Sequence, residues 1–373
     1  MTELGRPIAG VDTASLATLA TSSIALILRL QDGSGAYPAS PTFSAYAGYS
    51  WFRDGAFIAD AMSAAGEVES AHRFFDWCSR ILVARASQVG DIVHRSDTDN
   101  PVPDREMLAT RFTYAGDGGD DEWWDFQLDG YGTWLWAVAA HVGRHGRTAT
   151  EWLPAIELGV DYLISSWRRP CYDWWEERPE EVHVSTLGCI AAGLTAVAGL
   201  LDDVRLRAAL SAVEEIRALV LEQGVLEGHL TKWIGADDVD ASLLAVIHPL
   251  AVFPATGPVG AATIDAVDFQ LNHDGGVHRY LRDTFYGGGQ WPLLSCMLGL
   301  ALKAAGEHDR ALDHLRWAAA TATVEGHLPE QVATHLLAPE CEAEWVERWG
   351  TVATPLLWSH AMFVRLAVEL EIV

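Results

Sequence analysis

The chain has 373 residues, and 50% of them are hydrophobic, so it can bury a large core and does not belong to the disordered class. Its 51 acidic residues outnumber 25 basic ones and give a formal charge of −26, which disfavours nucleic acid and anionic membrane surfaces as partners. Neutral ligands are compatible with this charge. No linker rich in Pro, Gly or Ser interrupts the chain, so we expect residues 1–373 to form a single domain.

The five cysteines show neither paired spacing nor a Cys-x-x-Cys motif, which indicates reduced thiols. Met1 to Asp12 contain no basic segment followed by an apolar run and a cleavage site, so we expect no signal peptide. Ala14 to Leu30 is apolar, but it is short and interrupted by Ser and Thr, and we expect it to be a buried first helix. These observations predict a cytoplasmic protein. Nothing in the sequence indicates an oligomeric state.

Ala- and Leu-rich segments, separated by clusters of Gly, Pro and Asp, predict a chain that is almost entirely helical. The predicted helices span residues 13–31, 54–65, 68–87, 129–144, 149–167, 184–200, 203–222, 240–250, 259–271, 290–305, 308–322 and 355–371. Short turns, as at Gly66 and Gly306, alternate with long polar loops. This alternation suits a closed double ring of six inner and six outer helices.

The long loops of such a double ring meet at one end, so we expect their side chains to converge on the axis of the inner ring. The first of these loops runs from Tyr46 to Asp54 and contains Tyr49, Trp51 and Arg53. An adjacent Arg and Asp can grip two vicinal sugar hydroxyls with charge-assisted hydrogen bonds. The alternative is structural, with Asp54 capping a helix and Arg53 paired elsewhere.

The second loop, residues 116–130, is acidic and aromatic. Asp120, Asp121 and Asp125 resemble a magnesium-binding cluster of the terpene synthases, which are also all-helical and lined with aromatic residues. The second metal-binding motif expected on a later helix of that family is absent, and aromatic residues such as Trp123 separate the carboxylates. A metal-dependent terpenoid synthase is therefore the weaker hypothesis.

Residues 171–181 lie between two predicted helices and contain Asp173, Trp174, Trp175, Glu176 and Glu177. A carboxyl beside an indole surface is poorly solvated, so its pKa rises toward that of a general acid that works near neutral pH. The faces of the indole rings also suit the apolar faces of sugar rings. The alternative is a surface loop with solvated acids and two tryptophans anchored in the core.

Six short motifs occur in the order seen in glycoside hydrolase family 15, so the chain resembles a glucoamylase-type catalytic domain over about residues 13–371. The motifs are Tyr49-x-Trp51-x-Arg53-Asp54, Gln127-x-Asp129-Gly130, Asp173-x-Trp175-Glu176-Glu177, Arg279-Tyr280-x-x-Asp283, Glu330-Gln331 and Trp358-Ser359-His360. The resemblance implies an all-α (α/α)6 barrel that hydrolyses α-glucosides from the non-reducing end with inversion and releases β-glucose. Neither a metal nor a cofactor takes part in this mechanism, so we expect none.

The resemblance also implies roles for single residues. Glu176 matches the general acid and Glu330 the general base, which in an inverting enzyme stand roughly 6.5–9.5 Å apart to admit a water molecule. The residues implied to bind the substrate are Tyr49, Trp51, Arg53, Asp54, Trp123, Asp129, Trp175, Glu177, Arg279 and Trp358. One departure is Ala47, which stands where fungal members carry a tyrosine that contacts the transition state, with Tyr46 beside it.

The β-sandwich domain of many bacterial members and a starch-binding module are not found in the sequence. The chain therefore resembles the isomaltose glucohydrolases of the family more than its starch glucoamylases. We expect a cytoplasmic α-glucosidase acting on a neutral oligosaccharide, namely isomaltose or isomalto-oligosaccharides. The alternatives are a glucoamylase, a trehalase or a dextran glucosidase of the same family, and a sugar-binding barrel without hydrolytic activity.

Overall fold

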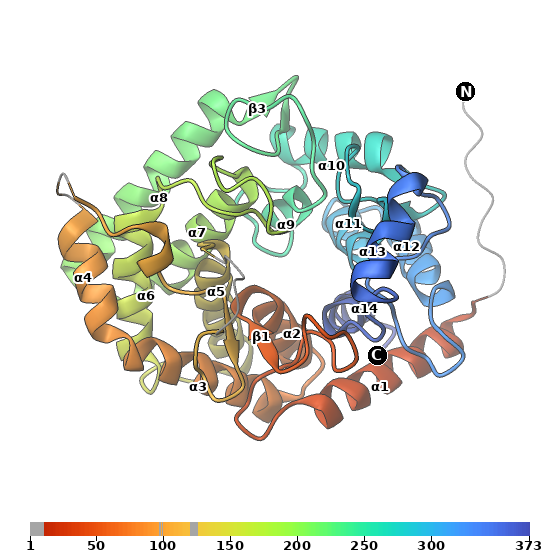
Figure 1. Ribbon diagram of the computed structural model, residues 1–373, viewed down its shortest axis with the longest axis horizontal. Coiled ribbons are helices and arrows are strands. Elements are labelled where there is room, and N and C mark those ends of the chain that lie inside the picture. The colour runs from red at the N-terminus through yellow and green to blue at the C-terminus, as the bar shows by residue number, and fades with distance from the viewer. Residues whose placement is uncertain (1–10, 97, 99, 120–125) are drawn as a thin grey trace.

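The computed structural model describes residues 11–96, 98, 100–119 and 126–373, and its helices form two concentric rings (Figure 1). The inner ring consists of α2 (Phe52–Ala64), α5 (Asp129–His145), α7 (Val184–Val197), α9 (Leu243–Ile247), α11 (Pro292–Ala304) and α14 (Leu357–Glu369). Each inner helix contacts the next, and α14 contacts α2, so the ring is closed. The predicted (α/α)6 barrel is confirmed.

The outer ring consists of α1 (Thr13–Leu30), α3 (Val68–Ala84), α6 (Leu153–Ser166), α8 (Asp203–Gln223), α10 (Pro258–Leu271) and α12 (His308–Ala320). Burial distinguishes the two rings. The inner helix α2 buries every side chain from Phe52 to Ser63. The outer helix α8 buries only Ala209, Ala212, Ile216 and Val220, whose helical spacing places them on one face.

The first helix, α1, is long and apolar enough to cross a membrane by composition alone. In the barrel, α1 packs against α14 and buries Leu16, Ala20 and Ile27. Ser23 Oγ lies 2.8 Å from His360 Nδ1 of α14, and this hydrogen bond is buried. The prediction that this segment is the first helix of the fold is confirmed, but only the face of it that packs on the barrel is buried.

Two glycines let α5 and α7 approach each other backbone to backbone. A Cβ atom at Gly132 would lie 2.4 Å from the carbonyl oxygen of Cys189, and a Cβ atom at Gly193 would lie 2.3 Å from the carbonyl oxygen of Gly132. Any larger residue would therefore push the two helices apart. Because α5 begins at Asp129 and the loop that carries Glu176 leads into α7, this contact fixes two walls of the site relative to each other.

Three antiparallel pairs of short strands lie in the connections. β1 (Tyr49–Trp51) pairs with β2 (Arg111–Thr113), β3 (Val225–Leu226) with β4 (His229–Leu230), and β5 (Asn272–His273) with β6 (Gly276–Val277). Four 3-10 turns also occur, η1 (Asp104–Glu106), η2 (Ala198–Leu200), η3 (Phe285–Gly287) and η4 (Pro339–Cys341). Strand β1 leads directly into α2, which begins with Phe52 and carries Arg53 and Asp54.

The prediction of secondary structure is wrong in three places. α4 (Ala86–Ser96) and α13 (Glu342–Trp349) were expected to be loops, and the predicted helix 240–250 contains only the five residues of α9. α4 buries only Val89 and Ile92, and α13 buries no residue completely. Both are short helices with few apolar residues, so their apolar faces are well defined but narrow and were missed.

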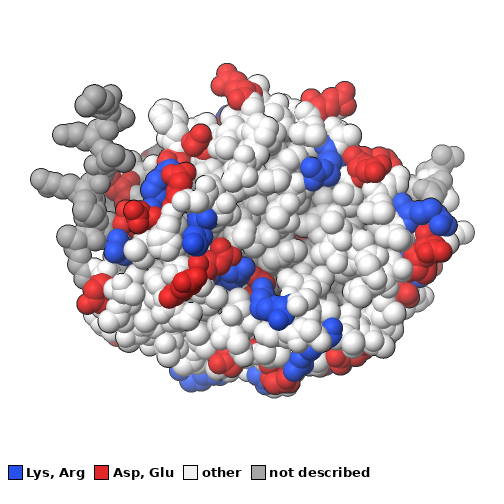
Figure 2. All heavy atoms as spheres, turned by 180° about the vertical axis from the view of Figure 1, so that it is seen from behind, with Lys and Arg blue, Asp and Glu red and all other residues white. Residues whose placement is uncertain are grey.

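Figure 2 shows the face of the molecule that lies behind the view of Figure 1. Acidic and basic side chains are interspersed there over a surface that is mostly uncharged. The described part of this face therefore offers no continuous basic patch to a polyanion.

Candidate active site

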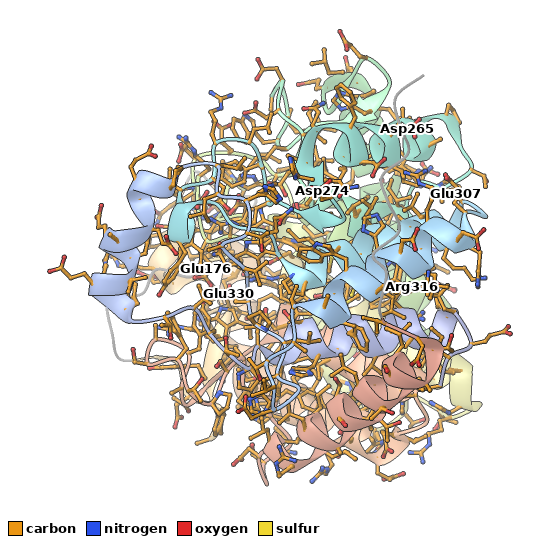
Figure 3. The ribbon with its side chains drawn as sticks, turned by 90° about the vertical axis from the view of Figure 1, so that its right-hand side faces the viewer. Glu176, Asp265, Asp274, Glu307, Arg316 and Glu330 are labelled. Carbon is orange, nitrogen blue, oxygen red and sulfur yellow. The ribbon has the colours of Figure 1, made fainter. Side chains whose placement is uncertain are left out.

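A cavity of about 250 Å³ is lined by residues from the β1–α2 region, the α6–α7 loop, the segment after β6, the α12–α13 loop, α13 and the start of α14. Nine of the twelve residues predicted from the sequence line it, namely Trp51, Arg53, Asp54, Trp175, Glu176, Glu177, Arg279, Glu330 and Trp358. The side view in Figure 3 places Glu176 and Glu330 near each other, toward the face that is in front in Figure 1. The loops therefore converge at one end of the barrel, as expected.

Two of the residues predicted to bind the substrate do not line the cavity, and their contact with a substrate stays a prediction. Tyr49 is one of them, and the Arg111 guanidinium of the paired strand β2 lies 4.1 Å from the centre of its ring. Asp129 is completely buried at the start of α5 and accepts a hydrogen bond from Arg53 Nη1 at 2.8 Å, so it positions Arg53 and does not face the cavity. Trp123, together with Asp120, Asp121 and Asp125, lies outside the described residues.

Arg53 and Asp54 present a donor and an acceptor side by side. Arg53 Nη1 donates to Gln127 Oε1 at 2.6 Å and to Asp129 Oδ2 at 2.8 Å, which fixes one edge of the guanidinium. On the other edge, Arg53 Nε lies 3.5 Å from Asp54 Oδ2, and neither atom has a hydrogen-bond partner among the described residues. Burial raises the pKa of Asp54 to about 6, although the charge of Arg53 opposes this. The pair can therefore bind two neighbouring hydroxyl groups of a neutral ligand.

Residues 171–181, named here the Glu176 loop, form a tight turn around the Asp173 carboxylate. Asp173 Oδ1 accepts hydrogen bonds from the backbone N–H groups of Trp175 and Glu177, both at 2.9 Å. Glu176, at the tip of the turn, has a positive φ of 62°. A non-glycine residue in this conformation costs free energy, so the turn needs support from its surroundings.

The Glu176 carboxyl accepts a hydrogen bond at Oε1 from Trp51 Nε1 at 2.7 Å. Burial raises its pKa to about 7, and the nearby Arg53 and the bond from Trp51 only partly offset that effect. The raised pKa agrees with the prediction, but the indole that donates to the carboxyl comes from β1. Chain neighbours of Glu176 were expected to supply it.

A buried lysine supports the Glu176 loop from behind. Lys232, which is 4% exposed, places Nζ 3.0 Å from Asp240 Oδ2 and 3.4 Å from Asp173 Oδ2. Asp240 in turn accepts a hydrogen bond at Oδ2 from Trp175 Nε1 at 2.9 Å. Lys232 and Lys303 are the two lysines of the chain, and no motif around Lys232 marks it. Sequence reasoning therefore missed this network.

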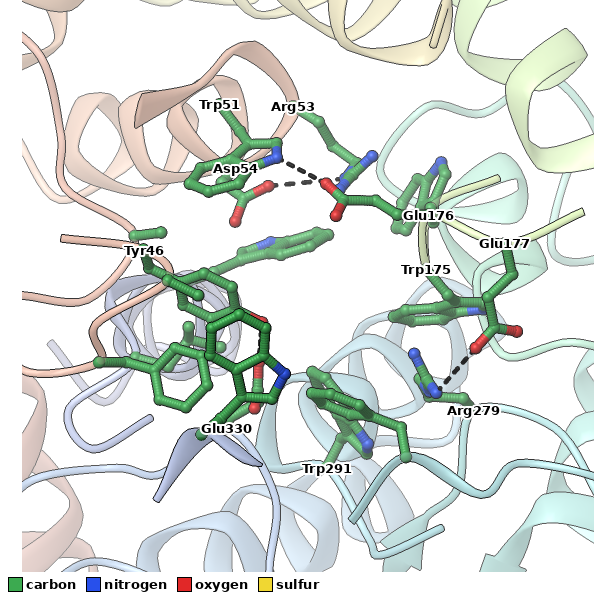
Figure 4. A pocket seen from close by; sticks show the side chains of 18 of the residues that line it. Tyr46, Trp51, Arg53, Asp54, Trp175, Glu176, Glu177, Arg279, Trp291 and Glu330 are labelled. Carbon is green, nitrogen blue, oxygen red and sulfur yellow. Dashed lines mark hydrogen bonds and ion pairs between the residues drawn. The ribbon is translucent and has the colours of Figure 1, made fainter. Parts of the chain in front are cut away.

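Glu330 faces Glu176 from the opposite side of the cavity (Figure 4). It is 2% exposed, its Oε1 accepts a hydrogen bond from Tyr46 Oη at 3.0 Å, and its Oε2 has no partner among the described residues. Burial raises its pKa to about 7, against the lowering effect of the Tyr46 hydrogen bond. Tyr46, next to the departure at Ala47, thus supplies a tyrosine hydroxyl to this wall. The distance predicted between the two carboxyls stays a prediction.

The third wall contains Arg279, which is almost completely buried. Its Nε donates to Asp283 Oδ2 at 2.7 Å, and its Nη2 lies 3.3 Å from Glu177 Oε1. Tyr280 Oη donates to the other oxygen of Glu177. Arg279 also lies 5.1 Å from the centre of the Trp175 ring. Glu177 therefore lines the cavity as a carboxylate held by a cation and a phenol.

Sequence reasoning left several aromatic residues of the cavity out of the candidate set, namely Phe43, Tyr46, Trp174, Phe285, Trp291, Trp345 and Trp349. The spacing of Trp345 and Trp349, four residues apart, is a helical signal that could have identified that pair. Two groups of side chains among the described residues have spacing that could hold a metal ion: His273, Asp274 and His335, and His72, Asp76 and Glu151. Neither group includes a residue that lines the cavity.

The cavity thus places two carboxyls of raised pKa opposite each other, beside a donor–acceptor pair and between tryptophan rings. One protonated and one ionised carboxyl can cleave an acetal bond when they act on opposite faces of a sugar ring. The aromatic walls suit the apolar faces of such a ring, and the arrangement requires no metal in its bond-breaking step.

Comparisons with known proteins give the same picture. The sequence profile of Glycosyl hydrolases family 15 matches residues 14–368. The chain is 52% identical over 367 residues to isomaltose glucohydrolase of Kribbella flavida, covering 97% of this chain and 95% of that protein. It is 29% identical over 351 residues to trehalase of Mycolicibacterium smegmatis, of which it covers 49%.

Solved structures are similar over nearly the whole chain. A wild-type glycosidase superposes with a TM-score of 0.93 at 51% identity, covering 98% of this chain and 100% of that one. One variant of a glycosidase with the same similarity was solved in complex with glucose. A bacterial glucoamylase complexed with acarbose has a TM-score of 0.75 at 20% identity, which supports the shared fold.

Proposed function

The chain belongs to glycosyl hydrolases family 15, and we propose from this premise that it is an inverting, exo-acting α-glucosidase of short α-glucosides, with isomaltose as its main substrate. The observation that carries the proposal is the pair Glu176 and Glu330, two carboxyls of raised pKa on opposite sides of one cavity. The choice of isomaltose is supported by the 52% identity to an isomaltose glucohydrolase.

In the proposed reaction, Arg53 Nε and Asp54 Oδ2 bind neighbouring hydroxyls of the terminal glucose. Protonated Glu176 donates its proton to the glycosidic oxygen as the bond from that oxygen to C1 breaks. Ionised Glu330 takes a proton from a water molecule, whose oxygen attacks C1 from the opposite face. The products are β-glucose and the shortened sugar, and proton exchange with solvent restores both carboxyls.

The electrostatics of the cavity support this division of labour. The pKa of each carboxyl is raised to about 7, chiefly by burial and in part by the charge of the nearby Asp54. Near neutral pH both carboxyls therefore titrate, so the state with a protonated Glu176 and an ionised Glu330 is populated. Oε2 of Glu330, which has no partner among the described residues, is the oxygen available to a water molecule.

The size of the cavity supports a short substrate, since about 250 Å³ lies below the roughly 300–1,000 Å³ of ordinary ligand pockets. The five cysteines are all free thiols, which supports the proposal that the enzyme works in the reducing cytoplasm. The formal charge of −26 supports a neutral partner over nucleic acid or an anionic membrane.

The test is a panel of isomaltose, maltose, trehalose, soluble starch and dextran, with glucose release measured and the first anomer identified by proton NMR. We expect isomaltose to have the highest kcat/KM and β-glucose to be the first product. Initial α-glucose would refute inversion, and a higher kcat/KM on trehalose or starch would move the substrate to the corresponding alternative. The same assay in EDTA is expected to give unchanged rates, whereas inactivation that a metal reverses would revive the metal-dependent hypothesis.

A further inference from the structure

The helix α13 has no role in the barrel itself. It spans Glu342–Trp349, buries no residue completely, and makes its main contacts with η3 and η4. Figure 1 shows it in front of α11 and α12, at the end of the barrel where the loops gather. Trp345 and Trp349 are four residues apart, so they share one face of the helix, and both line the cavity.

The position of α13 is fixed by aromatic packing and backbone hydrogen bonds. The ring of Trp345 lies 4.9 Å from that of Phe285 in an edge-on arrangement and is stacked at 6.1 Å on that of Tyr286. Tyr286 Oη donates to the carbonyl oxygen of Gly350 at 2.9 Å, just after the end of the helix. At the other end, the N–H of Ala338 donates to the carbonyl oxygen of Gly287 at 2.9 Å. The Trp345 indole and the backbone at both ends of α13 are therefore held in place before a ligand binds.

Exposure separates the inner and outer parts of the cavity. Arg53 and Trp358 are each 4% exposed and lie at its closed end, whereas Trp345 and Trp349 are partly exposed at its mouth. A sugar that is bound to Arg53 and Asp54 and cleaved beside Glu176 has its leaving group directed toward the mouth. Glu177, Arg279 and α13 line the same cavity, and the Phe285 ring lies 5.0 Å from the Arg279 guanidinium and 4.9 Å from the Trp345 ring.

We propose that Trp345 and Trp349 form the wall that binds the leaving-group sugar and that α13 limits the length of the substrate. This inference rests on the proposed glucosidase function. An indole ring can cover the apolar face of a pyranose ring without hydrogen bonds of fixed direction. Such a wall can therefore bind a leaving-group sugar whose orientation varies. In a longer oligosaccharide, the sugar units beyond the leaving-group sugar would have to enter the space that α13 occupies. We therefore expect longer oligosaccharides to bind less well than isomaltose.

The test uses Trp345→Ala, Trp349→Ala and the double variant, with Val346→Ala as the matched control. Val346 lies on the same helix, is 41% exposed and does not line the cavity. The substrates are α-glucosyl fluoride, isomaltose, isomaltotriose and a longer isomalto-oligosaccharide. Because fluoride is a leaving group without a sugar ring, activity on α-glucosyl fluoride reports the glucose site and the chemistry alone.

We expect the double variant to lose roughly tenfold or more of kcat/KM on isomaltose, as loss of an aromatic contact of ordinary strength would cause. Its activity on α-glucosyl fluoride should stay within about twofold of the parent, because this substrate has no leaving-group sugar that could contact the two indoles. The ratio of activity on the longest oligosaccharide to that on isomaltose should rise. Val346→Ala should change none of these values.

Equal losses on fluoride and isomaltose would overturn the proposal, because the two tryptophans would then act through the structure of the cavity and not through the leaving-group sugar. An unchanged ratio between long and short substrates would overturn the limit on length. Failure of the proposed function is a separate outcome, in which the parent protein hydrolyses neither α-glucosyl fluoride nor isomaltose. That result would overturn the proposed function and this inference together.

Discussion

The walls that carry Glu176 and Glu330 differ in how much structure holds each carboxyl. Behind the Glu176 loop, Lys232 joins Asp173 and Asp240 in a network of three buried charges, and the loop itself turns at a residue of positive φ. Glu330 has one hydrogen bond to its side chain, from Tyr46, and one backbone hydrogen bond, from its N–H to the carbonyl oxygen of Ala353.

The difference agrees with the task that the proposed mechanism gives to each carboxyl. A general acid has to point its proton at one oxygen of the substrate, so an unfavourable turn held by buried charges is useful there. A general base has to keep one carboxylate oxygen free for a mobile water molecule. Glu330 Oε2 accepts no hydrogen bond from any of the described residues. We therefore expect the Glu176 wall to be sensitive to changes at a distance and the Glu330 wall to be sensitive mainly at Glu330 and Tyr46.

The largest expected effect comes from removing each carboxyl. Glu330→Ala should lose activity on isomaltose and on α-glucosyl fluoride together, by about 10²–10⁴ in kcat, because both need an activated water molecule. Glu176→Gln should lose a similar factor on isomaltose but keep a much larger share on the fluoride, which needs little protonation. Binding of glucose, measured by calorimetry, should persist in both. If Glu330→Ala hydrolyses the fluoride at nearly the parent rate, the assigned roles are wrong.

The next effect tests the support of the Glu176 loop. Lys232→Met leaves two buried carboxylates without their cation, so we expect the free energy of unfolding in urea to fall by about 3–5 kcal/mol. Misplacement of Glu176 should also lower kcat on isomaltose by up to about 10²-fold. The loss on α-glucosyl fluoride should be smaller, because the acid matters less there.

Lys303→Met is the matched control, since Lys303 lies in the last turn of α11, away from the cavity. It should change neither stability nor the ratio of the two activities. Equal loss on both substrates in Lys232→Met would mean that the lysine supports only the fold.

A smaller effect tests the single hydrogen bond of the Glu330 wall. The Tyr46 hydroxyl lowers the pKa of Glu330, so Tyr46→Phe should raise that pKa. Because a base works only when ionised, the acidic limb of the pH–kcat profile should move to higher pH. At neutral pH we expect kcat to fall about tenfold, the effect of losing one hydrogen bond to a charged group. Tyr49→Phe is the control, since Tyr49 lies outside the cavity, and it should leave the profile where it is.

The smallest effect is on stability. Glu330 has an ordinary pKa of 4.5 in the unfolded chain and a pKa of about 7 in the fold, so its ionisation destabilises the fold as pH rises between these values. Glu330→Gln does not ionise. We expect this variant to gain about 1–3 kcal/mol of unfolding free energy relative to the parent between pH 4 and pH 8. A constant difference across this range, measured by urea denaturation, would contradict the raised pKa.

The sequence predicted a helix at the position of each of the twelve barrel helices, although the segment 240–250 forms only the short α9. It failed for α4 and α13, which carry few apolar residues and bury little in the core. The Arg53–Asp54 pair was predictable because the two residues are adjacent in the chain. Tyr46 and Glu330 are 284 residues apart, and Lys232 meets Asp173 across 59 positions, so no local pattern could join them.

Closure of the inner ring by α14 against α2 has a consequence for biosynthesis. The Arg53 guanidinium in α2 lies 5.6 Å from the ring of Trp358 in α14, so the lining of one cavity is built from opposite ends of the polypeptide. A nascent chain that still has α14 inside the ribosome exposes the apolar faces of α1 and α2 that α14 will cover. Closure of the ring thus waits for a contact between distant segments, and contacts of long sequence separation form slowly and leave apolar surface exposed to aggregation in the meantime. A prematurely terminated chain that lacks α14 should be removed by quality control before it can bind sugar.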